Sequence, residues 1–188
     1  MLTSFPRQAL SLVALTGVLA ASALAAPRAI SPSGTPTFRA AAQGYAVAFP
    51  SKPQISTRTQ EFAGRQVPFH IALSRAGSLT FVVVTTIYPR DARLSDPKRQ
   101  LDFVQQGFLL SAGSAGLKVL RREDLQLGGT PGRELLVGGA STPNQIRLRL
   151  FHTKRVAYQL MAIGPRKASA AQRAQSDKFL NSFRLLSS

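Results

Sequence analysis

Short connections between successive strand-like segments constrain the fold of this chain more than any other feature. Each segment is rich in apolar residues over the length of a strand, and most are bounded by Gly- or Pro-containing turns. Connections of hairpin length are too short for the crossovers that parallel strands require, so we expect an antiparallel sheet. The predicted strands are residues 45–49, 55–62, 66–74 and 79–88, and then, after a helix, residues 117–120 (extending as far as 127), 133–137, 144–151 and 156–163.

Two segments have helical rather than strand-like spacing. Asp96-Pro97 combines an N-cap residue with a proline at the first helical position, and apolar residues recur at helical spacing until Gly113. Residues 168–183 form a second amphipathic segment. Because the strand at 79–88 is apolar on both faces, we expect one helix on each face of the sheet. The predicted fold is α+β, a three-layer α/β/α sandwich.

The N-terminus has the layout of a secretory signal peptide. A basic start is followed by an apolar, alanine-rich stretch that ends in the small-residue motif Ala23-Leu24-Ala25. We therefore expect residues 1–25 to be a signal peptide, residues 26–37 a flexible Pro/Ser/Gly-rich tether and residues 38–186 a single domain. A retained membrane anchor is the alternative. The prediction is export to the periplasm or the extracellular space, with no membrane span after cleavage.

Charge is the unusual feature of the composition. The chain has 24 Lys and Arg residues against 8 Asp and Glu residues, a net charge of +16, and no cysteine. Such an excess attracts anionic partners and makes their binding sensitive to salt. Outside the cytoplasm these partners would be an envelope protein or an anionic lipid or wall polymer. We expect no nucleic-acid partner for an exported chain, and we expect a monomer.

A strand with alternating arginines supplies the candidate binding residues. If the preceding hairpin turns near residues 141–142, Glu134 lies opposite Arg149, which predicts a cross-strand ion pair. The functional alternative is a surface that binds an anion or a partner. The residues predicted for that surface are Arg133, Arg147, Arg149, Lys154 and Arg155.

No pattern in the chain predicts catalysis. His70 and His152 are the only imidazoles, and their spacing matches no metal or general-base motif, so we interpret each as a surface or edge residue. The adjacent carboxylates Glu123 and Asp124 would point to opposite faces of a strand. Neither a nucleophile elbow nor a phosphate loop is present. We predict a protein that is not an enzyme and that uses neither a metal nor a cofactor.

Several short sequence segments resemble those of the Mog/PsbP-like group of small exported domains, which includes the DcrB-type envelope proteins. These segments are the opening strand at 44–50 (GYAVAFP), residues 129–137 (GTPGRELLV), the hairpin at 147–164 and the end of the last helix at 179–183. The resemblance implies an antiparallel sheet between helices and a non-enzymatic protein that binds or stabilises a larger envelope assembly. In photosynthetic members that assembly is photosystem II, a role for which the scattered acidic residues here give no support.

The function predicted from the sequence is therefore an exported accessory domain that docks on an envelope protein or an anionic surface. Two alternatives remain. A small-molecule carrier would need an apolar pocket between sheet and helix, beside Phe103 or Phe108. A hydrolase acting on wall polymers would need a deep pocket that joins a histidine to a carboxylate.

Overall fold

The computed structural model describes residues 26–62, 65–89, 96–113 and 116–186. Their core is an eight-stranded sheet in which each neighbouring pair is antiparallel except β1 and β7, which are parallel. The strands in spatial order are β1 (Arg28–Ile30), β7 (Lys118–Leu127), β8 (Thr130–Gly138), β9 (Asn144–His152), β10 (Val156–Pro165), β6 (Leu79–Ile87), β5 (Arg65–Ala76) and β4 (Gln54–Phe62). The sheet is thus mixed, and the prediction of a purely antiparallel sheet is wrong at this one edge.

Tight turns set the register of the hairpins. Gly128 and Gly129 connect β7 to β8 with φ angles of 51° and 81°, a combination that two-residue hairpin turns require and that glycine adopts without strain. The turn between β8 and β9 places Glu134 directly opposite Arg149, as the sequence predicted. This register puts every second residue of each strand on the same face of the sheet.

Both helices begin at caps that are visible in the sequence. Helix α1 (Pro97–Gly113) follows Asp96, whose carboxylate accepts a hydrogen bond from the Lys98 amide at 3.1 Å. Helix α2 (Ala170–Asn181) starts after Ser169, and Ser169 and Gln172 form a reciprocal capping box. The predicted helix at 97–113 is confirmed at both ends, whereas α2 is shorter than the predicted segment 168–183.

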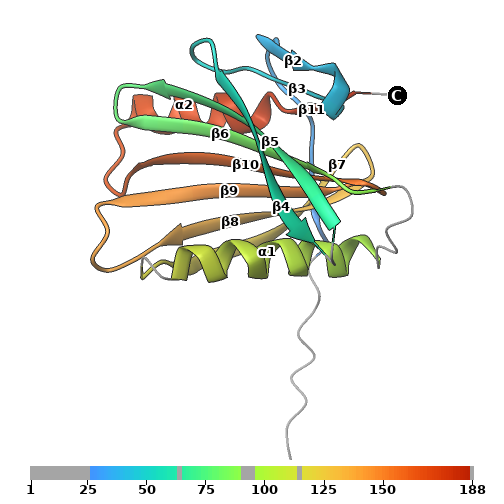
Figure 1. Cartoon of the computed structure of the whole chain (residues 1–188). Helices are drawn as coiled ribbons and strands as arrows, with labels where there is room; N and C mark the ends of the chain where they lie inside the picture. Colours follow the sequence, from blue (N-terminus) through green and yellow to red (C-terminus); the bar gives the residue numbers. More distant parts are fainter. Residues whose placement is uncertain (1–25, 63–64, 90–95, 114–115, 187–188) are drawn as a thin grey trace, which may run out of the picture.

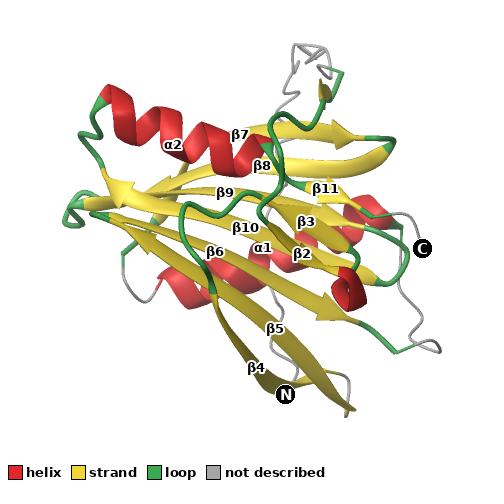
Figure 2. Ribbon diagram, turned by 90° about the horizontal axis from the view of Figure 1, so that it is seen from above, coloured by secondary structure: helices red, strands yellow, loops and turns green. Residues whose placement is uncertain are grey.

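The two helices pack against different strands. Helix α1 contacts β7, β8 and β9, and helix α2 contacts β6 and β10. A second, three-stranded sheet lies beside α2 and consists of β2 (Phe38–Ala40), β3 (Tyr45–Val47) and β11 (Arg184–Leu185), with the short 3₁₀ helix η1 (Ala41–Gln43) between β2 and β3. Figure 1 shows α1 and α2 on opposite sides of the large sheet, and Figure 2, viewed from the α2 side, shows α2 and the small sheet over it. The predicted α+β class is confirmed, but a simple three-layer sandwich omits the small sheet.

The core has two parts that correspond to these two sides. Phe81, Phe179 and Phe183 belong to a cluster that joins the large sheet to α2 and the small sheet. Leu101 of α1 and Leu148 of β9 belong to the second cluster. Alternation along strands such as β9, where Leu148 and Arg149 face opposite ways, separates the two clusters.

The segment expected to be a tether contains structure. Residues 28–30 form β1 and pair in parallel with Leu125–Leu127, and the Ser33 amide donates to the Asn181 carbonyl at 2.7 Å. The predicted signal peptide, residues 1–25, lies outside the described residues. Among the described residues, neither helix has the length and apolar character needed to cross a bilayer.

Candidate functional site

Arg149 and Glu134 form a buried ion pair between the sheet and α2. Their side chains are 2% and 4% exposed, and Arg149 Nε lies 2.6 Å from Glu134 Oε2. Arg149 Nη1 also donates to the carbonyl of Leu180, in the last turn of α2, at 2.9 Å. The predicted cross-strand pair is therefore present, and it also fixes the C-terminal end of α2 on the sheet.

Three further arginines surround the same carboxylate. Arg147 Nη2 lies 3.4 Å and Arg121 Nη2 3.5 Å from Glu134 Oε1, and Arg28 Nη2 lies 4.0 Å from Oε2. Arg147 also reaches Asp177 of α2 at 2.5 Å. Burial acts to raise the pKa of Glu134, but Arg149 and Arg147 outweigh it and hold that pKa below its usual value. We call these residues the Glu134 network.

Arg133 occupies the equivalent position on the opposite face. Its side chain, 4% exposed, donates to Asp124 at 3.1 Å and to Asp102 and Gln105 of α1 at 2.7 Å each. Arg122 lies 3.9 Å from Asp102 and 3.7 Å from Asp124. One buried arginine thus connects the sheet to α1, as Arg149 connects it to α2.

The remaining predicted binding residues lie elsewhere. Lys154 and Arg155 are exposed at the turn between β9 and β10, and Arg155 Nη2 donates to the Tyr88 carbonyl at 3.1 Å. The predicted residues therefore do not form one surface. Arg133 and Arg149 are buried on opposite faces of the sheet, whereas Lys154 and Arg155 lie at the end of a hairpin. The structure assigns Arg133, Arg147 and Arg149 to ion pairs within the fold.

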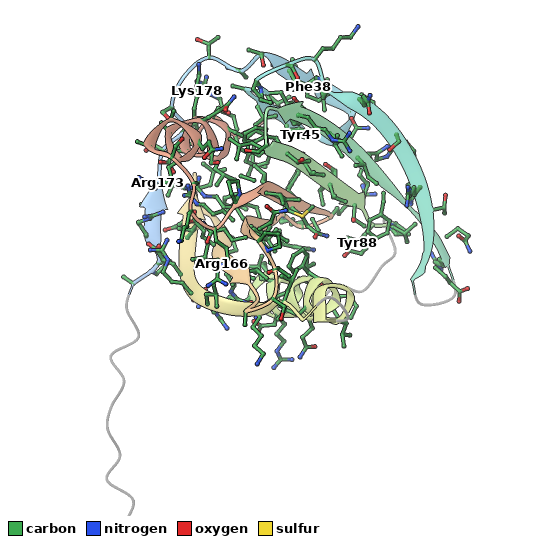
Figure 3. All side chains as sticks on the ribbon, turned by 90° about the vertical axis from the view of Figure 1, so that its left-hand side faces the viewer. Phe38, Tyr45, Tyr88, Arg166, Arg173 and Lys178 are labelled. Carbon is green, nitrogen blue, oxygen red and sulfur yellow. The ribbon has the colours of Figure 1, made fainter. Side chains whose placement is uncertain are left out.

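A different group of basic residues shares one end of the molecule. Hydrogen bonds tie its turns together: Ser51 to the Arg75 carbonyl, Gln172 to Ser78, and Arg166 to the carbonyls of Gly139 and Pro143. Lys118 pairs with Gly138 beside them. Figure 3 looks onto this end, with Arg166 and Arg173 labelled. We define its exposed cations as the basic end: Lys52, Arg75, Lys118, Arg166, Lys167 and Arg173.

The segments that form the basic end contain no acidic residue, and Asp177 follows Arg173 one turn later in α2. Residues 51–53, 74–80, 116–118, 138–146 and 164–174, which form this end, contain neither Asp nor Glu. In contrast, the carboxylates of the Glu134 network and those that pair with Arg133 lie on β7, β8 and the two helices. The sequence did not predict this group of cations, because five separate segments make up the end and only the fold brings them together.

The two histidines do not converge on one site. His70 is half-buried on β5, with Nδ1 3.2 Å from the Thr57 hydroxyl, and His152 is 2% exposed on β9. The interpretation of His152 as a surface residue is therefore wrong, because its alternation places it on the α1 face beside the ring of Tyr88, at 5.8 Å between ring centroids. Within the described residues, the acidic and histidine side chains form no cluster that could hold a metal ion.

We expect stability to depend on pH near neutrality through His152. Burial lowers its pKa, and the Thr153 backbone opposes that shift only in part. The unfolded chain therefore takes up a proton near pH 6.5 and the folded chain only at lower pH, so the free energy of unfolding falls with decreasing pH, by at most about 1.4 kcal/mol per pH unit. Urea denaturation at pH 7.5, 6.5 and 5.5 should show this slope in the native protein and in His70→Gln, and His152→Phe should abolish it. An unchanged slope in His152→Phe would assign the dependence to another group.

A cavity of about 340 Å³ lies between α1 and the strands that α1 leaves uncovered. Its walls include Phe103, Val104 and Phe108 of α1, and Val67 and Phe69 of β5. This is the position, beside Phe103 and Phe108, at which a small-molecule carrier would require a pocket. Its remaining described lining residues are Glu61, Thr86, Tyr88, Gly107, Ala157 and Gln159.

A large mixed sheet, two helices and a small second sheet together define an α+β domain with a PsbP-like fold. The chain is similar to the solution structure of cyanobacterial PsbP (CyanoP) from Synechocystis sp. PCC 6803. The match has a TM-score of 0.55 and 10% sequence identity, and it covers 79% of this chain and 90% of the other. No protein-family model and no curated protein sequence matches the chain. The predicted PsbP-like fold is thus confirmed.

Proposed function

We propose that this protein is an exported, non-enzymatic accessory domain that docks through its basic end on an anionic surface of the cell envelope. The observation that carries the proposal is the separation of charge. The carboxylates of the Glu134 network and those that pair with Arg133 are paired within the fold. In contrast, the basic end presents six exposed cations on segments that contain no acidic residue. A surface of this kind attracts anions at long range.

Several features support a rigid docking surface. The turns of the basic end are held together by hydrogen bonds, and Arg166 is anchored to the carbonyls of Gly139 and Pro143. The turns that carry its cations therefore keep their relative positions, which reduces the entropy lost on binding. The PsbP-like fold and the signal-peptide pattern of residues 1–25 are consistent with an exported accessory protein. A three-layer core, with a helix on each face of the sheet, would hold the basic end in place.

The test is co-sedimentation of the protein, residues 26–188, with isolated envelope membranes and with vesicles of anionic or neutral lipid. We expect binding that weakens with salt. The triple variant Arg75→Gln/Lys118→Gln/Lys167→Gln should bind anionic vesicles roughly a hundredfold more weakly, since each basic residue near such a surface contributes about 1 kcal/mol. These three side chains are exposed, so their replacement should leave the fold intact.

A matched control removes the same charge elsewhere. The triple variant Arg58→Gln/Lys98→Gln/Lys154→Gln replaces exposed cations outside the basic end and should bind within a few-fold of the native protein. Equal losses in the two variants would mean that net charge alone attracts the protein, and the proposed docking end would be wrong. Binding to membranes that is lost after protease treatment but resists salt would identify a protein partner in place of lipid or wall polymer.

A further inference from the structure

We propose that the cavity beside α1 binds a small neutral molecule that is mainly apolar. The cavity lies on the α1 side of the sheet and shares no residue with the basic end, so this inference does not depend on the docking proposal. Its volume of about 340 Å³ falls at the lower end of the range of ligand pockets, about 300–1,000 Å³. An apolar cavity of about 150 Å³ already holds benzene, so a larger ring system or a short alkyl chain fits here.

The lining residues define the chemistry of the ligand. Phe69, Phe103 and Phe108 supply aromatic walls from both the sheet and the helix, and Val67 and Val104 add aliphatic surface. Thr86 and Gln159 place a hydroxyl and an amide in the same walls, where they can hydrogen-bond one polar group of a ligand. Glu61 is the single charged residue of the described lining, and it repels an anionic head group. A neutral molecule with one hydrogen-bonding group therefore matches the cavity best.

Gly107 is a second observation that points to a ligand cavity beside α1. It lies within the 17-residue helix α1, where glycine is among the least favourable residues. Neither a positive φ nor a close approach requires it: a Cβ atom placed there would have no heavy atom within 4 Å outside its chain neighbours and the local helix backbone. Gly107 also lines the cavity, so the missing side chain leaves open the space that a ligand would occupy.

The side chain at position 107 therefore provides a sharp test. We would titrate the protein, residues 26–188, with the neutral fluorescent probe N-phenyl-1-naphthylamine, whose emission rises in apolar surroundings. The native protein should bind the probe, and Gly107→Leu should weaken binding at least tenfold because leucine fills the cavity. The same variant should unfold at a higher temperature, since leucine favours the helix far more than glycine does. Reduced binding could then not be attributed to misfolding.

Two controls separate the cavity from the helix surface. Gln106→Leu adds the same side chain at a neighbouring position of α1 that is exposed, like Gly107, but does not line the cavity, and it should bind the probe like the native protein. Gly107→Ala should raise the unfolding temperature while weakening binding much less than leucine, because a methyl group occupies little of the cavity. The proposal is overturned if the native protein does not bind the probe, or if Gly107→Leu binds it as tightly as the native protein.

Discussion

Replacing Glu134 with alanine should lower the free energy of unfolding by about 3–5 kcal/mol, because it leaves a buried arginine without its counter-charge. Arg149 is 2% exposed, and its other described hydrogen bond goes to the Leu180 carbonyl, so no carboxylate remains within its reach. Arg147 would keep its partner Asp177. Chemical denaturation of the native and variant proteins at pH 7 measures the difference.

The controls for this prediction use the same network. Asp177→Ala removes a carboxylate that is 51% exposed, and it should cost no more than about 1 kcal/mol, as exposed ion pairs do. The double variant Glu134→Leu/Arg149→Met removes both buried charges, and it should recover much of the stability that Glu134→Ala loses. If Glu134→Ala is no less stable than Asp177→Ala, the network does not hold α2 on the sheet.

The same ion pair predicts acid sensitivity. Because its arginine neighbours hold the pKa of Glu134 below the unfolded value, the stabilisation is complete above the unfolded pKa, near 4.3, and is lost as the pH falls through the lower folded value. This loss lies at more acidic pH than the one expected for His152, so the two contributions can be separated in one pH series.

Replacing Phe183 with alanine is the second change with a large expected effect, about 3–5 kcal/mol of unfolding free energy. Its ring is buried and stacks on Phe151 of β9, with centroids 5.5 Å apart and an interplanar angle of 8°. It also contacts Tyr45 of the small sheet at 5.8 Å and Tyr158 of β10 at 5.5 Å. Truncation would therefore open a cavity where the two sheets meet.

Thermal and chemical denaturation would measure this loss. Leu110→Ala is the matched control, since Leu110 is 81% exposed on α1 and its truncation should change stability by no more than about 0.5 kcal/mol. Phe183→Leu retains most of the apolar volume and should fall between the two. A loss for Phe183→Ala no larger than that for Leu110→Ala would mean that the small sheet contributes little to the stability of the domain.

Local sequence signals predicted the elements and one contact of the site. The cap at Asp96 is a short-range hydrogen-bond pattern, so the start of α1 could be located without knowledge of the tertiary structure. The Glu134–Arg149 pair was predictable because a tight turn and the two-residue period of a strand together set the register of a hairpin.

Other features depend on segments that are distant in the sequence. The parallel strand β1 was missed because Arg28–Ile30 is too short for a periodic pattern and pairs with residues almost a hundred positions later. Arg133 was assigned to a surface because its partner Asp102 comes from a helix 31 residues away. His152 was interpreted as exposed because its place at a hairpin end does not reveal that Tyr88 covers it.

The sequence by itself thus determined the strands, the helices, the excess of positive charge and the absence of thiol chemistry, all of which follow from local composition and periodicity. Only the tertiary structure decided which cations are available to a partner. It buries Arg133 and Arg149 against carboxylates, because a charge removed from water must be paired, and it gathers the cations of four separate segments at one end. The cavity beside Gly107 likewise exists only where α1 meets the strands that it does not cover.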